Sequence, residues 1–278
     1  MSYHREYIRN VAVFSLAAVL AGWAGHWLDT AVSGPSVEGI GQLLWIVLPV
    51  TTGALLRLLA GDGWRDAGVR PLFSGNGRWY LFSSLFFPLM ALLSMLAGAA
   101  SGAAVFSFPG AGAMLQAVMA ALLPSFIKNI FEEFAWRGYL TPRLAAAGMP
   151  DFANHTCTGV VWAAWHVPYY LYFLDGATMS AYSQHGPAVF YPMMFAGVAA
   201  LAFLYGELRL LTGSVWPMVV LHTVSNAVGG ALLLNGWLRM GPVADLMVSP
   251  APGSLLSILL NIAIGLGLHR YRKSRDSA

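Results

Sequence analysis

Eight apolar stretches, most of them long enough to cross a lipid bilayer, are the strongest constraint on the fold. A transmembrane helix needs about 20 mainly apolar residues. The fourth stretch is long enough to tilt or to project beyond the membrane, and the last is so short that seven spans remain an alternative. The expected spans are residues 10–28, 40–59, 79–99, 111–140, 156–174, 189–205, 215–234 and 255–268.

The composition is that of a membrane protein. Of the 278 residues, 58% are hydrophobic and 10% are charged, whereas a soluble domain usually has about 25% charged residues. The net charge of +3 does not indicate a nucleic acid partner, because the basic residues cluster between the apolar stretches. No linker between soluble domains is evident. We therefore expect residues 1–278 to form a single integral membrane domain, an all-α bundle of about eight transmembrane helices.

The distribution of Lys and Arg predicts the orientation of this bundle, because cytoplasmic loops carry an excess of these residues. Arg239 is the only Lys or Arg in the expected outer loops, which are residues 29–39, 101–110, 175–188 and 235–254. Eight spans with both termini in the cytoplasm account for this alternation. The basic residues on the expected cytoplasmic side are Arg5, Arg9, Arg65, Arg70, Arg78, Arg143, Arg209, Arg270, Arg272, Lys273 and Arg275.

The sequence FEEFAWRGYL places two carboxylates and an arginine at the end of the fourth stretch. Charged groups inside a membrane are costly, and they usually face a protein interior or a water-filled cavity and carry function. On a helix Glu133 and Arg137 share a face and can pair, whereas Glu132 points about 100° away. We expect Glu132 to be available for chemistry, and Lys128, one turn earlier, to pair or to extend towards the membrane surface.

Two further spans contain polar pairs at the spacing of one helical turn. Trp162 and His166 lie on the fifth, and His222 and Asn226 on the seventh. In the predicted topology Glu132, His166 and His222 lie 11 to 15 residues from polar markers at the cytoplasmic ends of their helices, which corresponds to about 15–20 Å. Three helices thus bring costly groups to a similar depth, as a single buried site requires. The other histidines lie in loops or near helix ends, and no functional role is expected for them.

These residue types fit the hydrolysis of a peptide bond without a covalent intermediate. A buried glutamate can act as a general base on water, and His166 can orient that water. A neutral histidine and the amide of Asn226 can donate hydrogen bonds to the developing oxyanion. Two histidines and a carboxylate are also a common catalytic zinc set, so Glu132, His166 and His222 are the candidate ligands of a divalent metal such as zinc. We expect a metal-free site, since the usual His-Glu-x-x-His helix is absent.

The motifs Glu132-Glu133-x-x-x-Arg137, Trp162-x-x-x-His166 and His222-x-x-x-Asn226 follow one another on expected membrane helices. In this order they resemble the three motifs of the CPBP family, the CAAX-prenyl-protease and bacteriocin-processing intramembrane endopeptidases, also called Abi proteins. The resemblance covers residues 111–231, the family core. The second motif commonly begins with Phe, and Trp162 keeps an aromatic wall there.

The resemblance implies a role for each motif residue. Glu132 would be the general base, with His166 beside the attacked water. His222 and Asn226 would form the oxyanion site, and Glu133 with Arg137 would brace the helix. The segment WRDAGVRP, within the polar connection 61–77, resembles an interfacial stretch that often precedes the core in bacterial members; a plain loop is the alternative.

The leading hypothesis is an intramembrane endopeptidase of the bacterial inner membrane, open to the cytoplasmic leaflet, that cleaves a membrane-associated or lipidated protein. Its partners would be that peptide or protein substrate and the lipid bilayer, and no nucleic acid. One alternative is a non-catalytic membrane adaptor that regulates a sensor kinase or confers bacteriocin immunity. Another is a transporter that uses Glu132 and the histidines as a proton relay.

Overall fold

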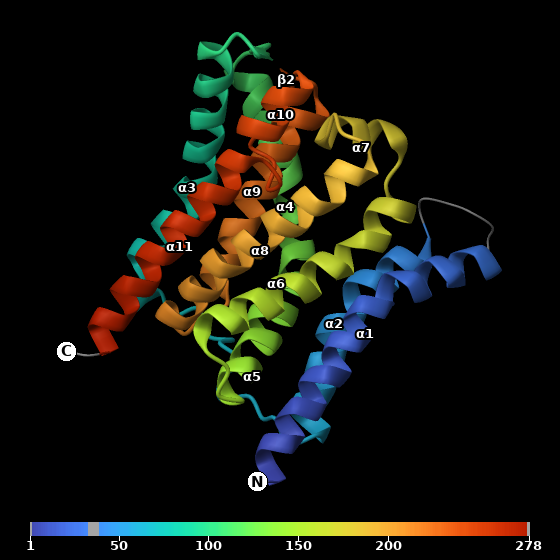
Figure 1. Cartoon of the computed structure of the whole chain (residues 1–278), viewed down its shortest axis with the longest axis vertical. Coiled ribbons are helices and arrows are strands. Elements are labelled where there is room, and N and C mark those ends of the chain that lie inside the picture. Colours follow the sequence, from blue (N-terminus) through green and yellow to red (C-terminus); the bar gives the residue numbers. More distant parts are fainter. Residues whose placement is uncertain (1, 33–38, 277–278) are drawn as a thin grey trace.

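The computed structural model describes residues 2–32 and 39–276, and residues 33–38 of the expected loop 29–39 lie outside this description. Helices make up nearly all of the described chain (Figure 1). The helices are α1 (Ser2–Val32), α2 (Ile40–Leu59), α3 (Phe73–Ala100), α4 (Ala111–Ala135), α5 (Thr141–Ala146), α6 (Asp151–Pro168), α7 (Gly176–Tyr182), α8 (Pro187–Thr212), α9 (Trp216–Leu234), α10 (Pro242–Val248) and α11 (Leu255–Asp276). Two π-helical segments, η1 (Trp136–Leu140) and η2 (Tyr169–Phe173), extend α4 and α6.

The all-α class is confirmed, and six helices in the described residues are long and apolar enough to cross a membrane. Helices α6 and α11 overlap the other two expected spans, but they are not apolar enough over a sufficient length to be counted with these six. The first turns of α6 contain polar residues such as Asn154 and His155, and the last turns of α11 are basic. Eight spans and cytoplasmic termini therefore remain predictions. The spans that meet the criterion are Glu6–Val32, Ile40–Leu59, Phe73–Ala100, Ala111–Ala146, Pro187–Thr212 and Trp216–Leu234.

The helices pack as a bundle in which α8 lies between α6 and α11, and α4 packs along α9 (Figure 1). Helices α1 and α2 form a pair at one side, where Gly25 approaches the backbone of Gly41 so closely that a Cβ atom would not fit. Two of the expected outer connections form a small two-stranded β-sheet. Strands β1 (Ala104–Phe106) and β2 (Leu238–Met240) pair antiparallel and tie the end of α3 to the end of α9.

The π-helical turn η1 is the most deeply buried part of the fourth span. All five of its residues are buried, whereas α4 before it is largely exposed. Within this turn the amide of Thr141 bonds to the carbonyl of Trp136, five residues earlier. A π-helical turn inside an α-helix is rare and is frequently found at functional sites. Here it begins three residues after Glu133, the second of the two glutamates.

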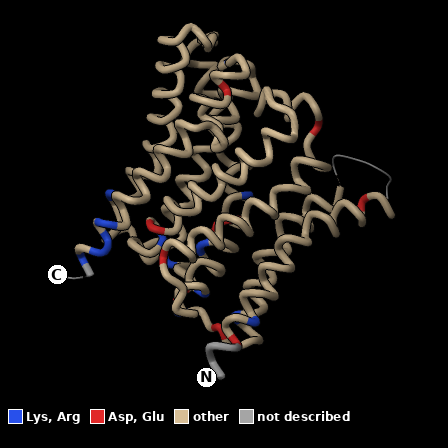
Figure 2. The backbone as a smooth tube through the Cα atoms, in the orientation of Figure 1, with Lys and Arg blue, Asp and Glu red and all other residues tan. Residues whose placement is uncertain are grey.

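The Lys and Arg residues gather at the end of the bundle where both described chain ends lie (Figure 2). If this end faces the cytoplasm, as the positive-inside rule predicts, reporters fused to the two termini will both be active in the cytoplasm. Fusion reporters that are active on only one side of the membrane provide the measurement. A result that places the two termini on opposite sides would contradict the eight-span topology.

The connection between α2 and α3 folds back onto this basic end through Asp66. Its carboxylate lies 2.7 Å from Arg57 and also pairs with Arg143. Burial alone would raise the pKa of Asp66, but the hydrogen bonds and charges of Arg57 and Arg143 outweigh burial and hold the pKa below its ordinary value. A carboxyl whose pKa is lowered by folding stabilises the fold above its unfolded pKa, and this contribution is lost as the pH falls.

The substitution Asp66→Asn should therefore lower the unfolding midpoint in detergent at pH 7. The difference from the wild type should shrink below about pH 4, where the unfolded carboxyl binds a proton. The test is to measure the thermal unfolding midpoints of both proteins between about pH 3 and 8, a range that includes the pKa of the unfolded carboxyl. A difference that is constant over this range would show that the charge of Asp66 does not contribute.

Candidate active site

Glu133 lies at the centre of the polar cluster and connects two of the motifs. Its side chain is fully buried on α4, and Arg137 Nη1 lies 3.2 Å from both of its oxygens. His222 Nδ1, on α9, lies 2.8 Å from Glu133 Oε1. Since a carboxylate only accepts hydrogen bonds, Nδ1 of His222 carries the proton in this contact. Glu133 therefore orients an imidazole as well as pairing with the arginine.

The guanidinium of Arg137 is held between two aromatic rings from other helices. Its Cζ atom lies 4.1 Å from the ring centre of Trp162 on α6 and 4.6 Å from that of Tyr205 on α8. Cation–π contacts of this kind strengthen when water is excluded, and all three side chains are buried. The pair of Glu133 and Arg137 is thereby fixed by four helical segments, α4 with η1, α6, α8 and α9.

Glu132 is also paired, in contrast to the expectation that it is available. Trp162 Nε1 donates to Glu132 Oε2 over 3.1 Å, and the ammonium of Lys128 binds Oε1. Lys128 thus pairs, as one of its two expected roles required. The Glu132 side chain has no exposed surface, whereas 34% of the Lys128 side chain is exposed. Lys128 is therefore the exposed member of this pair, and the contact between Lys128 and Glu132 must open before a water molecule can bind Glu132 Oε1.

His166 completes the cluster from α6. Its Nδ1 lies 2.9 Å from the carbonyl of Trp162, so this nitrogen is the protonated one. In the neutral form of both histidines, Nε2 is then the atom with the lone pair. The ring centre of Trp162 lies 5.8 Å from that of His166 and 5.7 Å from that of His222. Trp162 therefore lies beside both imidazoles and contacts Glu132 through its Nε1.

Asn226 is held by a residue that the sequence analysis did not identify. Asn226 Nδ2 donates to Asn129 Oδ1 over 3.2 Å, and Asn129 is completely buried on α4. Asn129 precedes Glu133 by four residues, so it lies on the same helix face. The four-residue spacing between Asn129 and Glu133 could have identified Asn129 from the sequence. Tyr205 was missed as well, and an aromatic residue in an apolar span carries no comparable signal.

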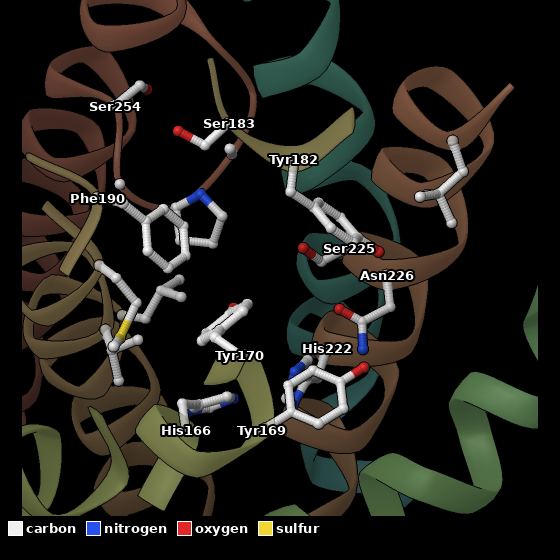
Figure 3. Close-up of a pocket in the computed structure, with 18 of the residues that line it drawn as sticks. His166, Tyr169, Tyr170, Tyr182, Ser183, Phe190, His222, Ser225, Asn226 and Ser254 are labelled. Atoms are coloured by element: carbon white, nitrogen blue, oxygen red, sulfur yellow. The ribbon is translucent and has the colours of Figure 1, made fainter. Parts of the chain in front are cut away.

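A cavity of about 450 Å³ has this cluster at one end (Figure 3). One polar end of the cavity is lined by Lys128, Trp162, His166, His222 and Asn226, and Glu132 does not reach the cavity. The cavity extends from there towards α7 and α10, away from the basic end of the bundle. Near α7 and α10 the lining of the cavity also contains Ser183, His185 and Asp245. Its walls are mostly apolar, with small side chains on α4 and larger ones on α8: Ala117, Ala121, Pro124, Phe190, Met193, Met194, Val198 and Leu201.

This arrangement agrees with the result of a family comparison. Residues 112–228 match the family model described as type II CAAX prenyl endopeptidase Rce1-like. The match makes this segment similar to the Rce1-like family. It contains all three motifs, and it agrees with the CPBP resemblance over residues 111–231. No curated protein matches the chain.

The candidate metal ligands named from the sequence, Glu132, His166 and His222, do not lie close enough together to share an ion. Among the described residues, these three are not a group whose ligand atoms lie within 4.8 Å of one another. Each histidine has the second partner on Nδ1 that metal-bound histidines usually have. Both Glu132 oxygens, however, are bound by Lys128 and Trp162, and an ammonium beside the carboxylate opposes a second cation.

A different group does meet the distance criterion, at the basic end of the bundle. Ligand atoms of Asp151, Glu207 and His269 lie within 4.8 Å of one another. Arg272 binds both carboxylates, at 2.8 Å from Asp151 and 2.9 Å from Glu207, and Lys273 lies 2.8 Å from Asp151. These cations already supply the positive charge that the acids require. The cluster fastens α11 to α6 and α8.

The substitution Glu133→Ala should strongly destabilise the protein, because it leaves the buried charge of Arg137 without a partner. Removal of one partner from a buried ion pair typically costs about 3–5 kcal/mol. The double variant Glu133→Ala/Arg137→Met should recover part of this loss. The unfolding midpoints of the three proteins in detergent provide the measurement, with Glu6→Ala on the exposed face of α1 as the control. Equal midpoints for wild type and Glu133→Ala would show that the pair is not stabilising.

Proposed function

We propose that this chain is an intramembrane endopeptidase that hydrolyses a peptide bond of a membrane-associated or lipidated protein, with Glu132 as the base. The observation that carries the proposal is the meeting of all three motifs around Trp162. Its ring lies beside both imidazoles, and its Nε1 binds Glu132. The Rce1-like match supports a CAAX-type protease activity.

In the proposed reaction a water molecule enters the polar end of the cavity, where His166 Nε2 accepts one of its hydrogen bonds. Opening of the contact between Lys128 and Glu132 frees a carboxylate oxygen to take a proton from this water. The water oxygen then bonds to the scissile carbonyl carbon. Collapse of the tetrahedral intermediate breaks the C–N bond, and Glu132 returns the proton to the leaving nitrogen.

The contacts also indicate which groups can stabilise the oxyanion. Asn226 uses one amide hydrogen on Asn129 and retains a second. Neutral His222 has its only proton directed at Glu133, so it can donate from Nε2 only when it is protonated. The expectation of a neutral histidine donor is therefore replaced in this proposal by the Asn226 amide, joined by protonated His222.

The site belongs, in this proposal, to a bacterial inner-membrane protein and lies nearer the cytoplasmic side. This placement depends on the basic end of the bundle facing the cytoplasm (Figure 2). The cavity runs away from that end, towards α7 and α10, so the opening of the site to the cytoplasmic leaflet stays a prediction. The mostly apolar walls suit a lipidated or apolar peptide segment.

The substitution Glu132→Gln should lower kcat by about 10²–10⁴-fold, the usual contribution of a general base. The assay would follow cleavage of a prenylated peptide, and of its unprenylated form, by purified protein in nanodiscs. Glu6→Gln, which changes an exposed acid on α1, serves as the matched control. A metal-free site predicts unchanged turnover in a chelator, whereas loss in chelator and recovery with zinc would indicate a metal.

Undiminished turnover by the Glu132 variant would remove this residue as the base. The adaptor alternative makes a different prediction for cells. If the chain acts only as a regulator, Glu132→Gln and His166→Ala will keep the biological activity while neither protein cleaves a peptide.

A further inference from the structure

The polar connection between α2 and α3, residues 60–72, lies directly against the π-helical turn η1. Arg57, at the end of α2, donates from Nη2 to the carbonyl of Gly138 over 2.6 Å. Arg209, near the end of α8, donates from Nε to the carbonyl of Arg137 over 2.9 Å. Two guanidinium groups from other helices therefore bind consecutive carbonyls of this turn.

The wider spacing of a π-helical turn explains why these carbonyls need external donors. Backbone hydrogen bonds in such a turn span five residues instead of four. The amide of Thr141 bonds to Trp136, and Pro142, five residues after Arg137, has no N–H to offer the carbonyl of Arg137. A buried carbonyl without a donor is destabilising. Hydrogen bonds from charged groups are the stronger kind, and both arginines are almost completely buried.

The connection holds the two guanidinium groups in place. The carboxylate of Asp66 pairs with Arg57 at 2.7 Å, and the backbone carbonyl of Asp66 accepts a hydrogen bond from Arg209. Gly68 has a φ of +67°, and a Cβ atom there would lie 2.6 Å from Arg209 Nη2. A glycine is thus required on two counts, the backbone conformation and the close approach of the arginine.

Arg209 does not owe its position to an ion pair. Among the described residues it makes no salt bridge within 4.0 Å, and its hydrogen bonds go to the carbonyls of Arg137 and Asp66. Burial of a guanidinium that binds only backbone carbonyls is costly. Its effect is to fix one point of the backbone, the residue whose side chain binds Glu133.

We propose that Arg57 and Arg209 are positioning residues for the active site and that the connection 60–72 is the element that sets them. They hold the carbonyls of η1, and η1 sets the backbone of Arg137. Arg137 in turn fixes Glu133, and Glu133 orients His222 through Nδ1. The kinetic part of this proposal rests on the proposed peptidase function, and the structural part does not.

The test compares Arg57→Gln and Arg209→Gln with Arg143→Gln in the full-length protein in nanodiscs. Arg143 is the matched control, because it anchors the same connection through Asp62 and Asp66 but gives no hydrogen bond to a carbonyl of η1. The measurements are the unfolding midpoint, hydrogen–deuterium exchange of the amides of residues 134–141, and kcat and KM with a prenylated peptide.

Both test variants should show faster exchange confined to the turn and a kcat lowered by about 10–100-fold, the range expected when a reacting group is displaced by about 1 Å. KM should stay within about twofold, since the cavity walls are unchanged. Arg143→Gln should lower the unfolding midpoint similarly but leave exchange in the turn and kcat within about twofold of the wild type, because the turn keeps both donors.

Unchanged exchange in the turn of the Arg57 and Arg209 variants would overturn the proposal. Equal loss of kcat in all three variants would also overturn it, because the arginines would then act only on stability. If exchange responds as expected but the wild type cleaves no peptide, the coupling is supported and the peptidase function fails. The same three variants therefore test the positioning role of the arginines and the peptidase function separately.

Discussion

The buried carboxylate of Glu133 is the contact on which the arrangement of the site depends. It binds Arg137 from its own span and His222 from α9, and the arginine lies between the rings of Trp162 and Tyr205. A charge inside an apolar bundle is tolerated only if it is paired and hydrogen-bonded. Helix positions that would separate these groups are therefore disfavoured, and one ion pair fixes four segments of the chain relative to one another.

The neighbouring acid, Glu132, has a different set of partners. Glu132 points about 100° away from Glu133, towards Trp162 and Lys128. The cation that pairs with Glu133, Arg137, is fully buried, whereas Lys128, the cation that pairs with Glu132, lines the cavity and is partly exposed. Adjacent acids thus provide one permanent anchor and one carboxylate whose cation can be moved. In the proposed function one residue type, glutamate, therefore has a structural role at one position and a chemical role at the next, because the two helix faces differ.

The sequence allowed the class of the fold and the local pairs to be predicted, but not the contacts between helices. The spacing of Glu133 and Arg137 follows from helix geometry, and their contact agrees with it. The contact of His222 with Glu133 joins residues 89 positions apart, which no local pattern specifies. The turn η1 was not predicted either, although Pro142, which lacks an N–H, lies two residues after it. Arg57 was a missed signal, as a cation inside an expected span usually has a function.

Two arginines that indicate membrane orientation in the sequence prove to have a structural role. Arg143 and Arg209 were counted as cytoplasmic markers, yet both are 6% exposed and bind acids or backbone carbonyls inside the bundle. Charges that are neutralised inside the protein contribute little to orientation, so the argument for a cytoplasmic basic end rests on the exposed residues of the same side. Seven basic residues of that side are exposed: Arg9, Arg65, Arg70, Arg78, Arg270, Lys273 and Arg275. The two groups of cations therefore differ in role: the exposed ones are the predicted markers of orientation, and the buried Arg209 binds the carbonyl of Arg137 in η1.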